Sequence, residues 1–540
     1  MFETQVLSFL IDKELYRNKE KMDKLIDLFH KKEKFLLGIE LVGTRGIIHQ
    51  DNGQKLMALV EELCKFPQVD WISFTDNAGG NPMISPEFLG RKVLGLGKNA
   101  VINITCKDNN RNSLESKAWQ YASEGFDNVM VLTGDYPIDG YQSLAQPVFD
   151  IDSTGLLKML SDMNNGLAIK GKKPGTTVTL NKTSFFPGCT VSPFKLSEAE
   201  QMMQYEKLLL KVRNGASFII PQLGYDIRKS HELLCFMKEN SINVPVVGNI
   251  YRLTAGIARM FNQGFFPGCV VSDSLLARID IEKTAPDKGR SFFTAFAAKQ
   301  LCCIKGMGYQ GVYIAGIDKP EDLSSILEKA KEYETTDWHD FIPELTNPRP
   351  GEFYYYQLDP KANLSDIAKK NDRLTNYRRS NYSKHNSLSY RFSRLVHASS
   401  FKSPSSFLGI HRAYYRWATK GKSRRCYNMS YFHERMIKSA LFNCQECGDC
   451  SLPDITYLCP ESQCSKNQRN GPCGGSDSDK CEVTKFGKHC IWVKAYNRNK
   501  YFNRDKVRLL DRPVILKDNN LFRTSGWGNF FLEKDHSAKK

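Results

Sequence analysis

AVINITCKDNNRNSLESKAWQYASEGFDNVMVLTGD, residues 100–135, contains two β-branched apolar runs with a helical segment between them. The runs are AVINITC (100–106) and NVMVLTGD (128–135), and LESKAWQYASEG separates them. Apolar runs that alternate with helices are typical of parallel strands, because the helix returns the chain to the same end of the sheet. This stretch therefore predicts one strand–helix–strand unit of a parallel sheet.

The same alternation extends over residues 35–317. The other predicted strands are FLLGIELVG (35–43), VDWISFTD (69–76), TTVTLNKTSFF (176–186), ASFIIPQLGYD (216–226), VPVVGNIYR (244–252) and GVYIAGI (311–317). Eight such strands with helices between them predict an α/β fold, the (β/α)₈ TIM barrel. The seventh unit is long, because residues 253–310 must contain more than one helix.

The length of 540 residues favours more than one domain, because a single hydrophobic core stops growing well before this size. We expect the barrel in residues 1–330 and a basic, mostly helical connector in 331–440. A cysteine-rich metal-binding domain with its tail is expected in 441–540. The Pro-rich stretch PELTNPRPGE (343–352) predicts a boundary.

The chain contains no apolar run of the roughly 18 residues that a membrane span needs. Its first 21 residues, MFETQVLSFLIDKELYRNKEK, lack the basic, apolar and small-residue order of a signal peptide. We therefore expect a soluble cytoplasmic protein. In a reducing compartment, clustered cysteines are more often metal ligands than disulfides.

Eight of the 16 cysteines lie within residues 444–490. The eight are Cys444, Cys447, Cys450, Cys459, Cys464, Cys473, Cys481 and Cys490. The first three form C-x₂-C-x₂-C and Cys459 precedes a proline, an arrangement similar to [4Fe–4S] sites, although the interval before Cys-Pro is longer than usual. The last four allow a second tetrathiolate site, with structural Zn²⁺ as an option. The spacing leaves an iron–sulfur cluster and zinc both open, and the glycines of NGPCGGS (470–476) would let backbone approach either closely.

The net charge of +17 is concentrated in the second half of the chain. Residues 371–430 contain 13 Lys and Arg but one acid, Asp372, and aromatic residues interleave with the basic ones. This pattern fits a solvated connector, a docking face for an acidic protein or membrane, or a nucleic-acid surface, of which nucleic acid is the weakest interpretation.

Polar residues end most of the predicted strands, where a (β/α)₈ barrel places its reaction site. They are Glu40, Thr75, Asp76, Asn103, Thr105, Asp135, Gln222 and Asn249. Glu40 lies among apolar neighbours in GIELVG, so we expect burial to raise the pKa of its carboxyl. A carboxyl that holds its proton at neutral pH suits a general acid. Asp135 supplies a second carboxylate at the same rim.

The first 330 residues resemble methylenetetrahydrofolate reductase, a flavin-dependent (β/α)₈ barrel. The most specific matches are KVRNGASFIIPQLGYD (211–226) and the Gly-Asp at 134–135. GIELVG, SFTDNAGG, NITC, VLTGDYP, FFPG and VPVVGNI also match, in the family's order. Residues 430–495 resemble the cysteine-rich C-terminal domain that is fused to, or partnered with, some of these reductases.

The resemblance implies a role for each matching residue. Glu40 would protonate the bridging nitrogen of the folate, Asp135 would lie between flavin and pterin, and Gln222 would hydrogen-bond the folate. The implied cofactor contacts are Thr75, Asn103, Thr105, Asp135, Phe186 and Lys211. Lys211 would meet the flavin phosphates as a point charge.

Four positions depart from the family pattern. Asn103 stands where an imidazole is expected and Thr133 where an arginine is common. Phe186 replaces the tyrosine of a Tyr-Pro pair, and Gln204 replaces an acid before Lys211. These positions concern flavin contacts, so FAD is expected while FMN stays open.

The leading hypothesis is an oxidoreductase of one-carbon metabolism that reduces 5,10-methylenetetrahydrofolate to 5-methyltetrahydrofolate. Electrons would come from NAD(P)H, or from an acidic protein such as a ferredoxin through the cysteine-rich domain. The alternatives are a non-catalytic accessory protein for folate or methyl transfer, and a zinc-containing nucleic-acid-binding protein. A homo-oligomer is left open.

Overall fold

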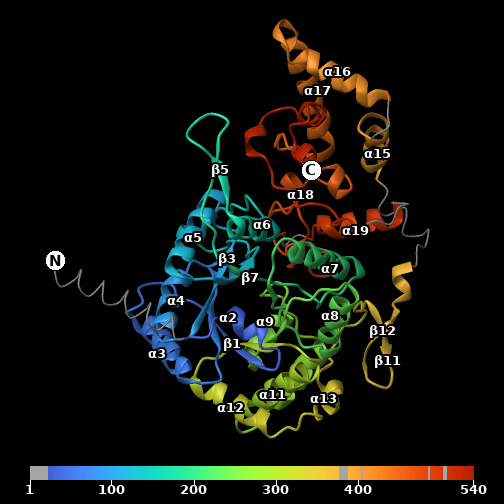
Figure 1. The fold of residues 1–540 in the computed structure, drawn as a ribbon. Helices are drawn as coiled ribbons and strands as arrows, with labels where there is room; N and C mark the ends of the chain where they lie inside the picture. Colours follow the sequence, from blue (N-terminus) through green and yellow to red (C-terminus); the bar gives the residue numbers. More distant parts are fainter. Residues whose placement is uncertain (1–21, 376–386, 403–405, 485–486, 503–507, 540) are drawn as a thin grey trace, which may run out of the picture.

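The computed structural model describes residues 22–375, 387–402, 406–484, 487–502 and 508–539 of the chain (Figure 1). The N-terminal stretch that we tested for a signal peptide lies outside the described residues. Parts of the basic segment 371–430 also lie outside them. None of the described helices has the length and apolar character needed to cross a membrane.

Eight parallel strands form the centre of the larger part of the molecule. In spatial order they are β8 (Phe218–Ile219), β7 (Phe186–Cys189), β4 (Asn128–Leu132), β3 (Asn99–Thr105), β2 (Trp71–Phe74), β1 (Leu36–Leu41), β10 (Gly311–Ala315) and β9 (Val247–Tyr251). A parallel bridge between Ile219 and Val246 joins the two edges of this sheet. The predicted (β/α)₈ barrel is confirmed.

Helices surround the strands and bury their apolar sides against them. They are α3 (Asp51–Lys65), α4 (Pro86–Gly95), α5 (Arg111–Glu124), α6 (Ser153–Asn165), α7 (Glu198–Arg213), α8 (Ile227–Glu239), α9 (Ala255–Asn262), α10 (Asp273–Glu282), α11 (Arg290–Gly306) and α12 (Pro320–Lys331). Three of them, α9 to α11, fill the long seventh unit, which was expected to contain more than one helix.

The fifth strand differs from the prediction. Residues 177–179 of the expected strand form β6 (Thr177–Thr179), which pairs antiparallel with β5 (Ala168–Lys170) in an exposed hairpin. The barrel strand is β7, which begins at Phe186, the last residue of the predicted run. The β-branched residues 176–179 favour extended structure in either setting, and the exposed hairpin buries none of β5 or β6.

A short helix, α2 (Leu25–His30), closes the N-terminal end of the barrel. Its Phe29 ring lies 5.6 Å from the ring of Phe186 and 5.4 Å from that of Phe218. These rings belong to an apolar cluster that fills the barrel at the end opposite the strand C-termini.

The connector contains a hairpin as well as helices. After α13 (Trp338–Leu345), strands β11 (Tyr356–Asp359) and β12 (Leu364–Lys370) pair antiparallel and pack on α8. The buried Glu232 carboxylate of α8 accepts a hydrogen bond from the Tyr355 amide at 2.6 Å. Among the described residues that follow, the connector is mostly helical, as predicted: α15 (Leu388–Ser400), α16 (Ser406–Ala418) and α17 (Arg424–Phe442). Figure 1 shows α16 and α17 farthest from the barrel.

The cysteine-rich region lies between these helices and the barrel (Figure 1). Most of it is irregular, with the short α18 (Pro460–Gln463) and the longer α19 (Ile491–Phe502), which packs on α7. The chain then returns past α17 through α20 (Gly526–Phe531). A small apolar cluster that includes Met203, Leu210 and Trp492 joins α7 to this region.

Candidate functional site

A cavity with about 1210 Å³ of empty space lies at the C-terminal ends of the barrel strands. We call it the barrel cavity. It is lined by seven of the eight residues to which the sequence assigned a catalytic, folate or cofactor role: Glu40, Thr75, Asn103, Thr105, Asp135, Lys211 and Gln222. Seven side chains from six strand–loop units therefore meet in one space, as the predicted rim requires.

Glu40 lies near the end of β1 and is partly accessible from the cavity. Its Oε2 accepts a hydrogen bond of 2.9 Å from the hydroxyl of Tyr313, on the neighbouring strand β10. Burial raises the pKa of the Glu40 carboxyl, and the Tyr313 hydrogen bond opposes part of that rise. Sequence reasoning missed Tyr313, which is the third residue of the apolar run GVYIAGI.

Asp135 follows β4 and is held from the opposite side of the cavity. Its Oδ2 accepts a hydrogen bond of 2.8 Å from the backbone amide of Gly79. The preceding Gly134 has φ +89°, and a Cβ there would lie 2.8 Å from the buried side chain of Lys107. Glycine is therefore needed in the Gly-Asp pair to bring Asp135 into the cavity.

Asp76 organises the side between β2 and β3. Its Oδ2 accepts hydrogen bonds from the amide of Thr105 at 3.1 Å and from the Thr105 hydroxyl at 2.6 Å. Asn103 is buried, and its Oδ1 accepts a hydrogen bond of 3.0 Å from Ser73. Burial raises the pKa of the Asp76 carboxyl, and the Thr105 hydroxyl opposes it. These bonds fix Thr105 and Asn103 at the cavity wall.

Lys211 reaches the cavity from α7. Its Nζ donates to the backbone oxygen of Thr190 at 2.6 Å, and burial lowers the pKa of its amine to about 8. Gln222 lines the same cavity, and its Oε1 accepts a hydrogen bond of 3.0 Å from the Leu223 amide.

Four buried polar atoms in the wall of this cavity have no hydrogen-bond partner among the described residues. They are Thr75 Oγ1, Ser192 Oγ, Gln204 Nε2 and Asn249 Oδ1. Leaving a buried polar atom unpaired costs about 1–3 kcal/mol, so four of them in one space require a polar ligand or water. The barrel cavity therefore fits a ligand with several hydrogen-bonding groups.

Phe186 is the one predicted contact that the structure places elsewhere. It lies at the start of β7, in the aromatic cluster with Phe29 and Phe218 at the closed end of the barrel. A barrel strand meets the cavity at its C-terminal end. The sequence predicted Phe186 at that end of its strand, whereas it is the first residue of β7.

The cysteine-rich region supplies one wall of the barrel cavity, which the sequence did not predict. The contributing residues are Lys466, Cys473, Gly474, Gly475 and Glu482. Lys466 Nζ donates to the backbone oxygen of Gly134 at 2.8 Å and pairs with Glu482 at 2.5 Å. Burial acts against the Lys466 charge, but the Glu482 carboxylate prevails and raises the pKa of the lysine.

Buried polar contacts hold this wall on the barrel. Lys207 Nζ, from α7, donates to the oxygen of Pro472 at 2.8 Å, and Lys195 Nζ donates to that of Ser476 at 2.5 Å. Asp152 accepts from the amide and side chain of Asn470 at 2.9 and 3.0 Å. The glycine-rich stretch 470–476 was expected to let backbone approach a metal or cluster, and the structure places this backbone at the barrel mouth against Lys195 and Lys207.

The eight clustered cysteines divide into two quartets. The outer quartet, Cys444, Cys447, Cys450 and Cys459, lines one pocket. The inner quartet, Cys464, Cys473, Cys481 and Cys490, lines another. Cys473 and Glu482 line both the inner pocket and the barrel cavity, and Glu461 lines both quartet pockets. The barrel cavity therefore adjoins the inner quartet pocket, which in turn adjoins the outer quartet pocket, and neighbouring spaces share side chains in their walls.

The quartets are wider than a zinc tetrathiolate. Across the described residues, no three of these eight sulfur atoms lie within 4.8 Å of one another. Four thiolates on one tetrahedral Zn²⁺, each with a Zn–S bond of about 2.3 Å, would lie roughly 3.8 Å apart. Burial raises the pKa of Cys447 and of Cys473 to about 12, so their thiolates need a compensating positive charge.

Buried charges surround the outer quartet. Lys438 Nζ lies 3.6 Å from Cys450 Sγ and pairs with Glu434 at 2.5 Å. Arg469 pairs with Glu461 at 2.9 Å, beside Cys447. These cations favour a cysteine site that carries net negative charge.

Comparison with known protein families follows the same division of the chain. A family model described as "Methylenetetrahydrofolate reductase" matches residues 29–331, which is more than half of the chain. The chain belongs to the methylenetetrahydrofolate reductase family. A second model, "Methylene-tetrahydrofolate reductase C terminal", matches residues 425–518 of this reductase-family protein.

Comparison with individual proteins adds little. No curated protein matches the reductase-family chain. One similar solved structure is an uncharacterized protein from Clostridium thermocellum that binds two copies of 5-methyl-5,6,7,8-tetrahydrofolic acid, with 12% identity, TM-score 0.41, and coverage of 57% of this chain and 98% of that one. Another is a putative deoxyribose-phosphate aldolase from Toxoplasma gondii ME49, with 9% identity, TM-score 0.29, and coverage of 57% and 96%. TM-scores this low say nothing further about the chain.

Proposed function

We propose that this protein reduces 5,10-methylenetetrahydrofolate to 5-methyltetrahydrofolate with a bound flavin. The observation that carries the proposal is Glu40, a carboxyl with raised pKa at the polar barrel cavity of a chain that belongs to the reductase family. The reduction needs a proton at the folate nitrogen, and an acid that keeps its proton near neutral pH provides it.

Each cavity residue has a part in this proposal. Glu40 holds the proton for the bridging nitrogen, and Tyr313 orients the carboxyl through its 2.9 Å hydrogen bond. Asp135 and Gln222 would bind the pterin from the other side. A general acid in such a position typically contributes about 10² to 10⁴-fold to the rate.

The flavin would lie against the polar wall. Thr75, Asn103, Thr105 and Lys211 would hold it, and the unpaired atoms of Thr75, Ser192 and Gln204 offer hydrogen bonds. When bound, the flavin supplies the hydride. FAD is our proposal, and FMN is the alternative because Thr133 and Gln204 depart from the family pattern.

We propose metal clusters in both cysteine quartets. The sulfur spacing favours [4Fe–4S] clusters, which are larger than a single Zn²⁺, while the buried cations suit the negative charge of either tetrathiolate site. Bound clusters supply one-electron transfer. The shared side chains Cys473 and Glu461 support a route from the outer quartet through the inner quartet to the barrel cavity.

Two sources of electrons fit this arrangement. NAD(P)H would meet the flavin directly, whereas a protein donor would enter through the quartets. The cysteine-rich wall covers part of the barrel mouth, which favours the protein donor.

The domain division is also a proposal. The barrel would span residues 1–330, the connector 331–440 and the cysteine-rich domain 441–540, and the packing of β11 and β12 on α8 supports adding residues 338–371 to the barrel. Cytoplasmic location and a homo-oligomer stay predictions.

The decisive experiment is a comparison of Glu40→Gln with Glu33→Gln, an exposed control. Both proteins are purified anaerobically, and their flavin, iron and zinc are counted. We expect Glu40→Gln to keep its flavin but to lose about 10² to 10⁴-fold of its folate reduction with a dye donor, while Glu33→Gln stays active. Wild-type protein that binds no flavin under reconstitution would sink the proposal.

A further inference from the structure

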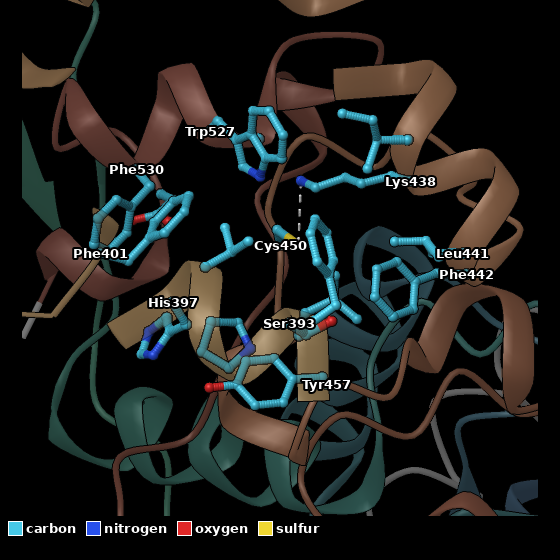
Figure 2. Close-up of a pocket in the computed structure, with 17 residues that line it drawn as sticks. Ser393, His397, Phe401, Lys438, Leu441, Phe442, Cys450, Tyr457, Trp527 and Phe530 are labelled. Carbon is cyan, nitrogen blue, oxygen red and sulfur yellow. Dashed lines mark hydrogen bonds between the residues drawn. The ribbon is translucent and has the colours of Figure 1, made fainter. Parts of the chain in front are cut away.

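A second cavity, which we call the outer cavity, adjoins the pocket of the outer quartet and shares Cys450 with it (Figure 2). It has about 650 Å³ of empty space and is lined almost wholly by apolar and aromatic side chains. They include Phe392, Phe401, Tyr457, Trp527 and Phe530. These side chains come from α15, α20 and the segments beside them.

The outer cavity ends on a cysteine of the outer quartet. Cys450 forms part of its wall, and Figure 2 shows Lys438 reaching over it, with Nζ 3.6 Å from the sulfur. The same ammonium lies 5.4 Å from the Trp527 ring. A group that enters this cavity would therefore stand beside a cluster ligand.

Helices α15 and α17, which line this cavity, and the neighbouring α16 are strongly basic, while Glu533 and Glu446 outside these helices pair with Arg412 and Arg435, and Asp535 lines the cavity. Residues 387–442 contain eleven Lys and Arg but one acid, Glu434. Glu434 is buried and paired with Lys438, so it offers no negative charge to a partner. We call the exposed part of these helices the basic face.

Apolar side chains are exposed on the same helices. They are Leu388, Phe392, Leu395, Phe407, Ile410, Trp417, Met429, Phe432, Met436, Ile437 and Leu441, each between 37% and 83% exposed. An exposed apolar surface with charged residues around it marks an interaction site. A second copy of the chain is disfavoured as the partner, because two basic faces would repel each other.

We infer that the basic face and the outer cavity form the docking surface for a small acidic electron-carrier protein, which delivers electrons to the outer quartet. This inference rests on the proposed function. The charge complementarity would speed the encounter, and the apolar contacts would hold the carrier against Cys450.

The electron balance sets the stoichiometry. Each reduced carrier gives one electron and leaves oxidised, so two carriers serve one folate. With two protons, the two electrons break one C–N bond of the N–CH₂–N bridge and form one C–H and one N–H bond. The proton for the nitrogen comes from Glu40, and solvent supplies the second.

The test uses the anaerobic full-length holoprotein and a reduced recombinant plant-type ferredoxin as the probe. Arg391 and Arg394 of α15, beside Phe392 and Ser393, are both changed to Glu. The control changes Lys170 and Lys172, which are exposed on the β5–β6 hairpin, to Glu. The melting temperature and the metal content show whether the charge reversal disturbs folding. If it does, the milder Arg391→Gln/Arg394→Gln pair replaces it.

We expect the α15 reversal to weaken ferredoxin binding at least about tenfold, because attraction between the basic face and the acidic carrier steers their encounter. The ratio of ferredoxin-driven to dye-driven turnover should fall by the same factor as the binding. Raising the salt concentration should weaken ferredoxin binding more in the wild type than in the α15 reversal. The hairpin control should behave like the wild type. Ile437→Glu, which places a negative charge at the outer cavity, should also lower the ratio.

Unchanged ferredoxin kinetics in the α15 reversal, in the milder Arg→Gln pair and in Ile437→Glu would overturn the inference. So would loss of dimerisation, or of binding to anionic vesicles or nucleic acid, in these variants while ferredoxin turnover stays constant. Stopped-flow oxidation of ferredoxin by the holoprotein without folate separates the two proposals. If this oxidation occurs but dye-driven folate reduction does not, the proposed function fails and the docking surface stands.

Discussion

The two cysteine quartets have similar ligands but different surroundings. The inner quartet shares Cys473 and Glu482 with the barrel cavity and is tied to α7 through Lys207. The outer quartet lies between α17 and the C-terminal segment, beside an apolar cavity and a basic surface. The difference teaches that one quartet is built into the wall of the barrel cavity, whereas the other lies beside the outer cavity and the basic face.

The C-terminal residues 518–539 strengthen this division, because three of them hydrogen-bond to Gly448 and Asp449 within the outer quartet segment. Asp449, two residues after Cys447, accepts a hydrogen bond from the His536 amide at 3.2 Å and pairs with its ring at 2.5 Å. Burial opposes the histidine's charge, but Asp449 and Asp454 raise the pKa of His536 to about 9. The outer quartet thus depends on residues far along the chain, and the inner quartet depends on the barrel.

The largest expected effect comes from Lys466→Met, which leaves the buried Glu482 unpaired at the inner boundary. Breaking a buried ion pair in this way costs about 3–5 kcal/mol of unfolding free energy. Thermal and denaturant unfolding measure the loss. Lys466→Met/Glu482→Gln should recover most of it, and Lys488→Met, an exposed change in the same region, should cost little. Equal stability of Lys466→Met and Lys488→Met would mean that the inner quartet is not built into the barrel.

A pair of cysteine variants compares the quartets directly. Cys473→Ser and Cys450→Ser should each lose the metal of one quartet, because each removes one thiolate ligand. Only Cys473→Ser should also weaken flavin binding, since its side chain lines the barrel cavity. Metal counts and flavin titration of both proteins make the comparison. Equal flavin affinity in the two variants would contradict it.

The smallest expected effect is a pH dependence of flavin binding. Burial lowers the pKa of Lys211 to about 8, so its amine is charged below that pH and neutral above it. This pKa lies below that of an ordinary lysine. Above pH 8, the neutral amine must therefore take up a proton before it can pair with a bound phosphate. We expect FMN affinity of the apoprotein to fall up to about tenfold per pH unit above pH 8. Lys211→Met should remove this dependence, and a retained slope would assign it to another group.

The sequence predicted the barrel well, because buried parallel strands are nearly continuous apolar runs. It failed at the fifth strand, where TTVT has strand propensity but lies in an exposed hairpin, while the true strand is the short FPGC. Propensity is local, and burial depends on the rest of the fold.

The cavity residues on strand ends, such as Glu40 and Asp135, followed from the barrel geometry alone. The spacing of the cysteines separated Cys444–Cys459 from Cys464–Cys490, and the structure places the two groups in two pockets, while their role as metal ligands stays a prediction. Lys466 and Glu482 could not be predicted, because they reach the barrel through packing between segments over 300 residues apart. Phe186 lies at the closed end of the barrel because it is the first residue of β7, whereas the predicted strand ended at this residue.

The wall that Lys466 and Gly474 contribute has a consequence for how the molecule matures. Synthesis completes the barrel first, with its mouth still open, and the covering segment arrives later. With the iron–sulfur clusters proposed above, that segment would settle only once its thiolates had received iron. A cell starved of iron would then accumulate chains with an uncovered mouth, which would exchange the proposed flavin more freely and be exposed to proteases.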